Sequence, residues 1–142
     1  MSAIVFVYGT LKEGFANFSV NKGRRVPGDY ETVACLPLYI IGRYYLPWLV
    51  NKPGVGSHVA GQLFEVRDRE LARMDVLERV NELGWYTRSE VLVRSRDASA
   101  ATRIKSVVYF GSRGRLHSEV IHVGPIQEFT AAHDSIYRRS RV

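Results

Sequence analysis

The sequence predicts a single α+β domain, built mostly from short strands with one inserted helix. Its 142 residues, 46% hydrophobic and 24% charged, are typical of one soluble domain with a substantial core. Several β-branched and aromatic runs end at Gly, Pro, Asp or Ser, as short strands do. Only one segment has convincing helical periodicity. We therefore expect one domain over residues 1–142, with the structure of the tail from about residue 125 left open.

The strands follow from composition. The run from Ala3 to Tyr8 indicates a buried strand that opens into a turn at Gly9. Four further runs have strand composition: Tyr30 to Cys35, His58 to Val66, Ser89 to Val93 and Arg103 to Phe110.

The other segments are less regular. The helix is expected over Asp68 to Val80, with Asp68 as its N-cap. The segment from Gly42 to Gly56, rich in Tyr, Pro and Gly, favours an ordered aromatic loop. A last helix is expected to start after Gly124-Pro125, because proline is tolerated at the first helical position. We expect a frayed tail over Arg138 to Arg141.

Composition limits the partners. The net charge of +6 suits acidic ligands, but Lys22, Arg24 and Arg25 are dispersed without interleaved aromatic residues, so we expect no nucleic-acid partner. The N-terminal apolar run lacks the basic region of a signal peptide, and no stretch approaches the roughly 20 apolar residues of a membrane span. Cys35 is the sole cysteine, which excludes an internal disulfide and favours a reducing compartment. We expect a cytoplasmic monomer with no membrane partner.

The predicted helix carries two acids on its apolar stripe. At 100° per residue, the side chains within roughly a 100° arc are Leu71, Met74, Asp75 and Glu78. Burial raises the pKa of a carboxyl group toward the range in which it both takes and returns a proton, so the pattern indicates a general acid and base. The alternative is that one acid caps a backbone group and the other pairs with an arginine.

The turn after the first strand has two interpretations. The backbone N–H groups of Tyr8-Gly9-Thr10-Leu11 could point outward together and bind an anion or an oxyanion. Thr10-x-x-Glu13 also matches a capping box, which would make the same residues a helix start.

Other motifs favour neither a metal nor a cofactor. The four histidines, His58, His117, His122 and His133, lack metal-ligand spacing. Gly54-x-Gly56 lacks the third glycine of a dinucleotide motif. We expect a protein without metal or organic cofactor.

Taken together, the motifs resemble the γ-glutamyl cyclotransferase superfamily, in its branch of γ-glutamylamine cyclotransferases and AIG2-like proteins. The resemblance spans roughly Ile4 to Tyr109 and rests on the order and spacing of its motifs. They are Phe6-Val7-Tyr8-Gly9-Thr10-Leu11-Lys12 with Gly14 and Asn17, Pro47-Trp48-Leu49 with Pro53-Gly54-x-Gly56, Val59-x-Gly61, and Met74-Asp75-x-x-Glu78 followed by Tyr86-x-Arg88. Two features depart from the family pattern: Met74 replaces the usual Leu, and Val80 to Gly84 make the stretch before Tyr86 long.

The resemblance implies a small mixed β-barrel with flanking helices. It makes Glu78 the general acid and base, and the implied substrate-binding residues are Tyr8, Gly9, Thr10, Leu11, Trp48 and Tyr86. The implied reaction cyclises a γ-glutamyl amine, such as γ-glutamyl-ε-lysine, to 5-oxoproline and releases the amine without a cofactor. The alternatives are a cyclotransferase for γ-glutamyl amino acids or glutathione, and a catalytically silent module that binds a small molecule.

The aromatic loop adds an expectation about the leaving amine. Tyr44, Tyr45 and Trp48 are expected to border the pocket mouth, because aromatic side chains between prolines are costly to leave in water. The alternative for Trp48 is core packing, since its apolar neighbours could draw it inward.

Overall fold

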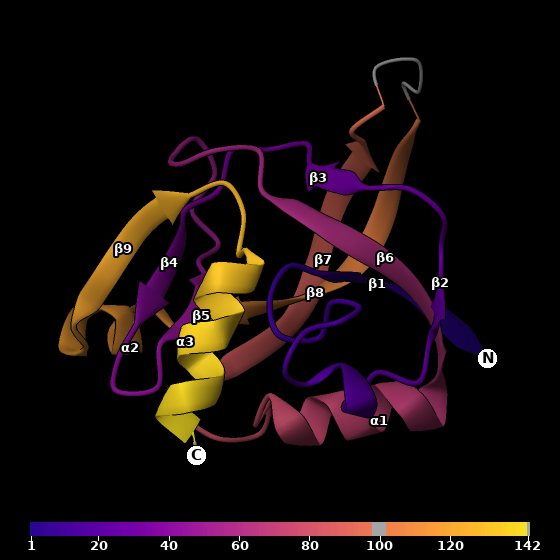
Figure 1. Ribbon diagram of the computed structural model, residues 1–142. Helices are drawn as coiled ribbons and strands as arrows, with labels where there is room; N and C mark the ends of the chain where they lie inside the picture. The colour runs from indigo at the N-terminus through magenta and orange to yellow at the C-terminus, as the bar shows by residue number, and fades with distance from the viewer. Residues whose placement is uncertain (98–101, 142) are drawn as a thin grey trace.

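The main sheet of the computed structural model, which describes residues 1–97 and 102–141, curls into a barrel (Figure 1). Its strand order is β1-β8-β7-β3-β6-β2, and β1 also pairs with β6, so that five strands close into a ring. The β1–β8 pair is parallel, whereas the other pairs are antiparallel. The small mixed β-barrel is therefore confirmed. Its strands are β1 (Ser2–Val7), β2 (Arg24–Arg25), β3 (Tyr30–Thr32), β6 (Ala60–Arg67), β7 (Tyr86–Ser95) and β8 (Arg103–Gly111).

A second sheet lies beside the barrel, with strand order β5-β4-β9. It consists of β4 (Leu38–Ile41), β5 (Leu46–Leu49) and β9 (Ile121–Ile126). The expectation of a loop over Gly42 to Gly56 is thus wrong for Leu46–Leu49. All four residues of β5 are buried, so the strand has no polar alternation that would reveal it, and Pro47 is tolerated because β5 is an edge strand.

The helices flank these sheets. They are α1 (Asp68–Leu77), which runs along the lower edge of Figure 1, α2 (Arg113–Ser118) and α3 (Ala131–Arg141), with a short 3-10 turn η1 (Phe18–Val20). The N-cap of α1 is Arg67 rather than Asp68, and its N–H donates to the Glu70 carboxylate at 2.9 Å. The apolar stripe is confirmed in part, because Leu71 and Met74 are buried.

The C-terminal segment differs from the prediction. Pro125 belongs to the edge strand β9, where a missing N–H is tolerated, and α3 begins only at Ala131. The residues expected to fray form the last turn of α3 instead. Two buried side chains that precede this turn, those of Asp134 and Tyr137, anchor the helix. Asp134 accepts a hydrogen bond from the Ala16 N–H at 2.9 Å, and the Tyr137 hydroxyl accepts one from the Asn17 amide at 3.0 Å.

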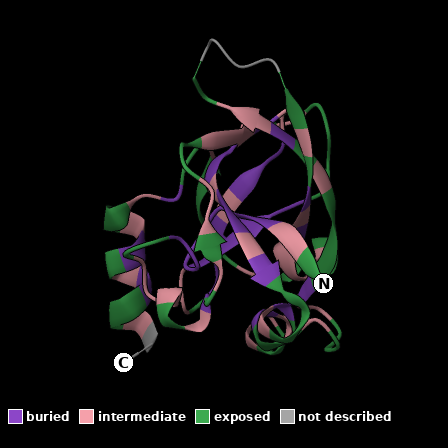
Figure 2. Cartoon of the chain, turned by 90° about the vertical axis from the view of Figure 1, so that its right-hand side faces the viewer, coloured by how far each residue is buried: buried purple, intermediate pink, exposed green. Residues whose placement is uncertain are grey.

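The core fills the inside of the curled sheet, where the buried residues gather (Figure 2). A close backbone approach there explains the Val59-x-Gly61 motif. A Cβ atom on Gly61 would lie 2.5 Å from the Val7 carbonyl oxygen and 2.6 Å from the Phe6 ring. Within the described residues, none of the helices has both the length and the apolar character that crossing a membrane requires.

Candidate active site

A cavity of about 310 Å³ lies where the turn after β1 meets the end of α1. Its lining contains all the predicted site residues except Trp48. The lining residues are Phe6, Val7, Tyr8, Gly9, Thr10, Leu11, Pro47, Glu78, Tyr86 and Tyr109.

Glu78 occupies the C-cap of α1, because the chain leaves the helix at the next residue. Arg79 has a left-handed φ of 53°, and its N–H donates to the Val76 carbonyl at 3.2 Å. The Val80 N–H donates to the Asp75 carbonyl at 3.1 Å, which completes a Schellman motif. The predicted helix end at Val80 was therefore three residues too late. The periodicity does not reveal this stop, since glycine usually occupies the left-handed position.

The carboxyl group of Glu78 lies in an unusual environment. Desolvation by burial raises its pKa from 4.5 to about 8. Across residues 1–97 and 102–141, this carboxyl forms no hydrogen bond or ion pair. A carboxyl group with a pKa near neutrality and no protein partner is able to exchange protons with a bound molecule.

Asp75, the other acid on the stripe, is fully engaged. One carboxylate oxygen accepts a hydrogen bond from Arg88 at 2.7 Å, and the other accepts one from the Tyr109 hydroxyl at 2.7 Å. Pairing with an arginine, which was the alternative considered for these two acids, thus holds for Asp75 alone. Its contacts connect α1 to β7 and β8, on the side where Tyr109 lines the cavity.

The turn after β1 presents unused backbone donors. Among the hydrogen bonds of the described residues, none uses the backbone N–H groups of Gly9, Thr10 or Leu11. No helix begins there, so the capping-box interpretation of this turn is wrong. Asn17 fixes its shape, because the Asn17 N–H donates to the Thr10 carbonyl at 2.9 Å and its amide to the Thr10 hydroxyl at 2.9 Å. Gly9 packs tightly, since a Cβ there would lie 2.7 Å from Pro47.

Three buried tyrosines form much of the remaining wall. The Tyr8 hydroxyl donates to the Tyr109 carbonyl at 2.6 Å, and the Tyr86 hydroxyl donates to the Pro47 carbonyl at 2.5 Å. Burial raises the pKa of Tyr8, Tyr86 and Tyr109 above the ordinary value, with a further upward contribution from Glu78 in each case. These hydroxyls therefore stay neutral, and each is held by a defined acceptor.

Trp48 does not line the cavity, which corrects the expectation for this residue. Its side chain is fully buried, its indole N–H donates to the Ser112 carbonyl at 2.9 Å, and its ring centroid lies 4.4 Å from that of Tyr86. Its strand β5 is buried on both faces, so the core-packing alternative holds. Tyr44 and Tyr45 also lie outside the lining.

A second cavity, of about 380 Å³, adjoins the first and shares Thr10, Pro47, Glu78 and Tyr86 with it. Among the lining residues that sequence reasoning did not assign to the site are Trp85 and Tyr137. Trp85 directly precedes the Tyr-x-Arg motif and could have been noticed. Tyr137 comes from α3, which only tertiary packing brings to the site. The described part of the chain contains no group of three or more His, Cys, Asp or Glu side chains placed to hold a metal ion.

The chain is similar in sequence to known proteins. The family model described as "Gamma-glutamyl cyclotransferase, AIG2-like" matches residues 5–125. A putative gamma-glutamylcyclotransferase of Arabidopsis thaliana is 41% identical over 96 residues, which cover 63% of this chain and 50% of that protein. The gamma-glutamylaminecyclotransferase of Homo sapiens is 33% identical over 120 residues, which cover 75% of this chain and 77% of that protein.

Solved structures share the fold. The crystal structure of an AIG2-like protein from Mus musculus has a TM-score of 0.69 and 30% identity, and the alignment covers 81% of this chain and 82% of that one. A structure described as a gamma-glutamyl cyclotransferase, at 16% identity and a TM-score of 0.61, shares the fold alone; the alignment covers 79% of this chain and 68% of that one. The chain spans about half the length of the Arabidopsis relative. The family expected from the motifs is confirmed, and the chain belongs to the γ-glutamyl cyclotransferase, AIG2-like family.

Proposed function

We propose that the protein cyclises the γ-glutamyl group of γ-glutamyl amines to 5-oxoproline and releases the free amine. The observation that carries this proposal is the position of Glu78. An unpaired carboxyl group with a pKa of about 8 lines the same cavity as the unused N–H groups of the turn after β1. The name of the human relative, gamma-glutamylaminecyclotransferase, supports the amine as leaving group.

The substrate supplies its own nucleophile in this reaction. Its α-amino nitrogen attacks the side-chain carbonyl carbon, which closes a five-membered ring. The protein therefore has to hold the substrate folded, move two protons and stabilise an oxyanion. The cavity offers a group for each task, and none of them requires a metal.

Glu78 performs both proton transfers. Its carboxylate accepts a proton from the α-ammonium group, which frees the attacking lone pair. The resulting carboxylic acid then donates that proton to the leaving nitrogen as the carbon–nitrogen bond breaks. The regenerated carboxylate takes the remaining extra proton from the ring nitrogen, which leaves 5-oxoproline as a neutral lactam, and passes it to the released amine or to solvent. A pKa of about 8 keeps both protonation states populated near neutral pH, which suits a group that takes and returns one proton.

The turn after β1 binds the negative charge. The N–H groups of Gly9, Thr10 and Leu11 have no protein acceptor among the described residues, so a substrate carboxylate or the developing oxyanion satisfies them. Tyr8 and Tyr86 flank the γ-glutamyl group as neutral walls. Trp48 supports this arrangement from behind, through its contact with the Tyr86 ring.

The experiment is to incubate the purified chain with a panel of γ-glutamyl compounds and to measure 5-oxoproline. The panel contains γ-glutamyl alkylamides, γ-glutamyl-ε-lysine, γ-glutamyl α-amino acids and glutathione. We expect turnover of γ-glutamyl amines by the wild-type chain and a loss of about 10²- to 10⁴-fold in Glu78→Gln. Turnover of glutathione or γ-glutamyl α-amino acids in place of γ-glutamyl amines would replace the proposed leaving group, and no turnover at all would favour a silent binding module.

A further inference from the structure

The loop that follows the turn after β1, residues 12–17, lies beside the C-terminal segment that contains α3 (Figure 1). Hydrogen bonds spread along both segments join them. They are Lys12 Nζ to the Phe129 carbonyl at 2.5 Å, the Arg138 guanidinium to the Gly14 carbonyl at 3.3 Å, the Ala16 N–H to the Asp134 carboxylate at 2.9 Å, and the Asn17 amide to the Tyr137 hydroxyl at 3.0 Å. The C-terminal segment thus holds this loop at several points along its length.

The buried side chains of α3 carry polar groups. Among the α3 side chains over residues 131–140, the buried ones are Asp134 and Tyr137. Burial of a carboxylate costs free energy unless the group is paired, and Asp134 is paired with the Ala16 N–H and, at 3.3 Å, with Arg138. Directional hydrogen bonds of this kind fix the position of two segments more narrowly than apolar contact does.

Asn17 connects α3 to the turn itself. Its side-chain amide donates one hydrogen to the Thr10 hydroxyl at 2.9 Å and the other to the Tyr137 hydroxyl at 3.0 Å, so both amide hydrogens are used. The Asn17 backbone N–H donates to the Thr10 carbonyl at 2.9 Å. A continuous chain of hydrogen bonds therefore runs from Tyr137 through Asn17 to Thr10, whose backbone N–H belongs to the donors of the turn.

The placement of this turn determines how well its donors bind negative charge. Backbone N–H groups stabilise an oxyanion only when they are already aimed at the position of the charge, and a displacement of about 1 Å can lower a rate by about 10²-fold. Gly9 and Thr10 lie outside the helices and strands, so no regular ladder of backbone hydrogen bonds holds them. Contacts from other segments have to do so.

We propose that α3 positions the turn after β1 for the reaction, and that Tyr137 acts through Asn17 as a positioning residue. The Tyr137 hydroxyl orients the Asn17 amide, and the amide in turn orients Thr10. The inference rests on the proposed function, and it gives a helix far along the chain a part in binding the negative charge of the substrate.

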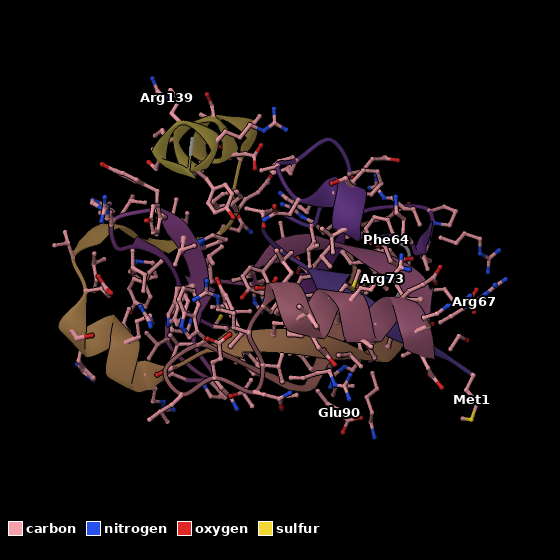
Figure 3. The ribbon with its side chains drawn as sticks, turned by 90° about the horizontal axis from the view of Figure 1, so that it is seen from below. Met1, Phe64, Arg67, Arg73, Glu90 and Arg139 are labelled. Carbon is pink, nitrogen blue, oxygen red and sulfur yellow. The ribbon has the colours of Figure 1, made fainter. Side chains whose placement is uncertain are left out.

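The test removes one hydroxyl group. Tyr137→Phe deletes the acceptor of the Asn17 amide. Tyr30→Phe is the matched control, because the Tyr30 hydroxyl donates to the Pro27 carbonyl at 3.1 Å and Tyr30 lines neither cavity. Arg139→Gln changes an exposed side chain that points outward from the same helix (Figure 3). The measured quantities are kcat and KM for 5-oxoproline formation, under conditions in which urea denaturation shows that each protein is folded.

We expect kcat/KM to fall about tenfold in Tyr137→Phe and to stay within about twofold of the wild-type value in both controls. The pH at which kcat/KM rises should not move, because Glu78 is unchanged. In isotope-labelled protein, the backbone amide resonances of Gly9 to Leu11 should shift in Tyr137→Phe and keep their wild-type positions in both controls.

Tyr137 also lines the second cavity, so direct contact with the substrate is the competing explanation for a loss of activity. A double-variant cycle with Asn17→Ala separates the two explanations. If Tyr137 acts through Asn17, adding Tyr137→Phe to Asn17→Ala should lower kcat/KM no further. Additive losses overturn the positioning role, since Tyr137 then acts on the substrate itself. The resonance measurement needs only Tyr137→Phe, so it decides the question if Asn17→Ala does not fold.

The outcomes separate the two proposals. Wild-type turnover that Tyr137→Phe leaves unchanged, or turn resonances that do not shift, overturns the positioning role and leaves the proposed function intact. A wild-type chain that forms no 5-oxoproline from any member of the γ-glutamyl panel overturns the proposed function and the positioning role with it.

Discussion

Replacing Glu78 by glutamine should make the protein more stable at alkaline pH while it removes activity. The unfolded chain releases the Glu78 proton near pH 4.5, whereas the native state keeps it until about pH 8. Between these values the native state binds more protons, so the contribution of Glu78 to the free energy of unfolding falls as pH rises. Glutamine stays neutral at every pH, so the variant escapes this loss.

The magnitude follows from the size of the pKa shift. Each pH unit between 4.5 and about 8 corresponds to about 1.4 kcal/mol, which sets an upper bound on the order of 5 kcal/mol. Because Glu78 is only half-buried, we expect a smaller value, about 2–3 kcal/mol. The difference between variant and wild type should be smallest near pH 4.5 and should level off above pH 8.

The assay is urea denaturation of both proteins at a series of pH values from 5 to 9. Glu90→Gln is the matched control, because it removes a carboxylate from an exposed position on β7 that lies at the periphery in Figure 3. The difference in free energy of unfolding between Glu90→Gln and the wild type should stay small at every pH in the series. If the difference in free energy of unfolding between Glu78→Gln and the wild type is equally independent of pH, the Glu78 carboxyl is solvated like that of a surface residue. The physical basis for its role as a base is then lost.

Four further predictions use the same site. The kcat/KM for a γ-glutamyl amine should rise with pH through about 8, since the deprotonated form of Glu78 is the base; a flat profile from pH 6 to 9 would contradict this. Asp75→Asn should lower the free energy of unfolding by about 1–2 kcal/mol in urea titrations, because its two hydrogen bonds are partly exposed, and should reduce turnover less than Glu78→Gln does. Gly9→Ala should reduce turnover at least tenfold, because its Cβ would displace Pro47 or the turn, whereas an unaffected rate would show that the turn adapts. Dialysis against EDTA should leave 5-oxoproline formation unchanged, and a loss that zinc restores would refute a metal-free mechanism.

Much of the barrel is predictable because its strands have local signatures. The β-branched runs that became β1, β6 and β8 are bounded by turn residues, and the predicted bounds of β1 and β8 agree with the structure to within one residue. The strand β5 has no such signature, because its four residues are buried on both faces and include Pro47. It forms a hairpin with β4, with Leu38 opposite Leu49 and Ile41 opposite Leu46, and only the folded chain shows that both faces of β5 are covered.

The sequence by itself determined which residue types are available for the chemistry. Helical periodicity placed Asp75 and Glu78 on the stripe that contains the buried Met74, and the family motifs marked the turn at Gly9. Both depend on residues close together in the chain, where spacing alone decides which side chains share a face.

Only the tertiary structure decided how the two acids differ. Asp75 meets Arg88 from β7 and Tyr109 from β8, so its carboxylate is paired, whereas Glu78 lies past the helix end against buried side chains that desolvate it. Tyr137 reaches the second cavity from a helix far along the chain. The pKa of a carboxyl group depends on everything packed around it in space, and these neighbours are far apart in sequence, so no local pattern specifies them.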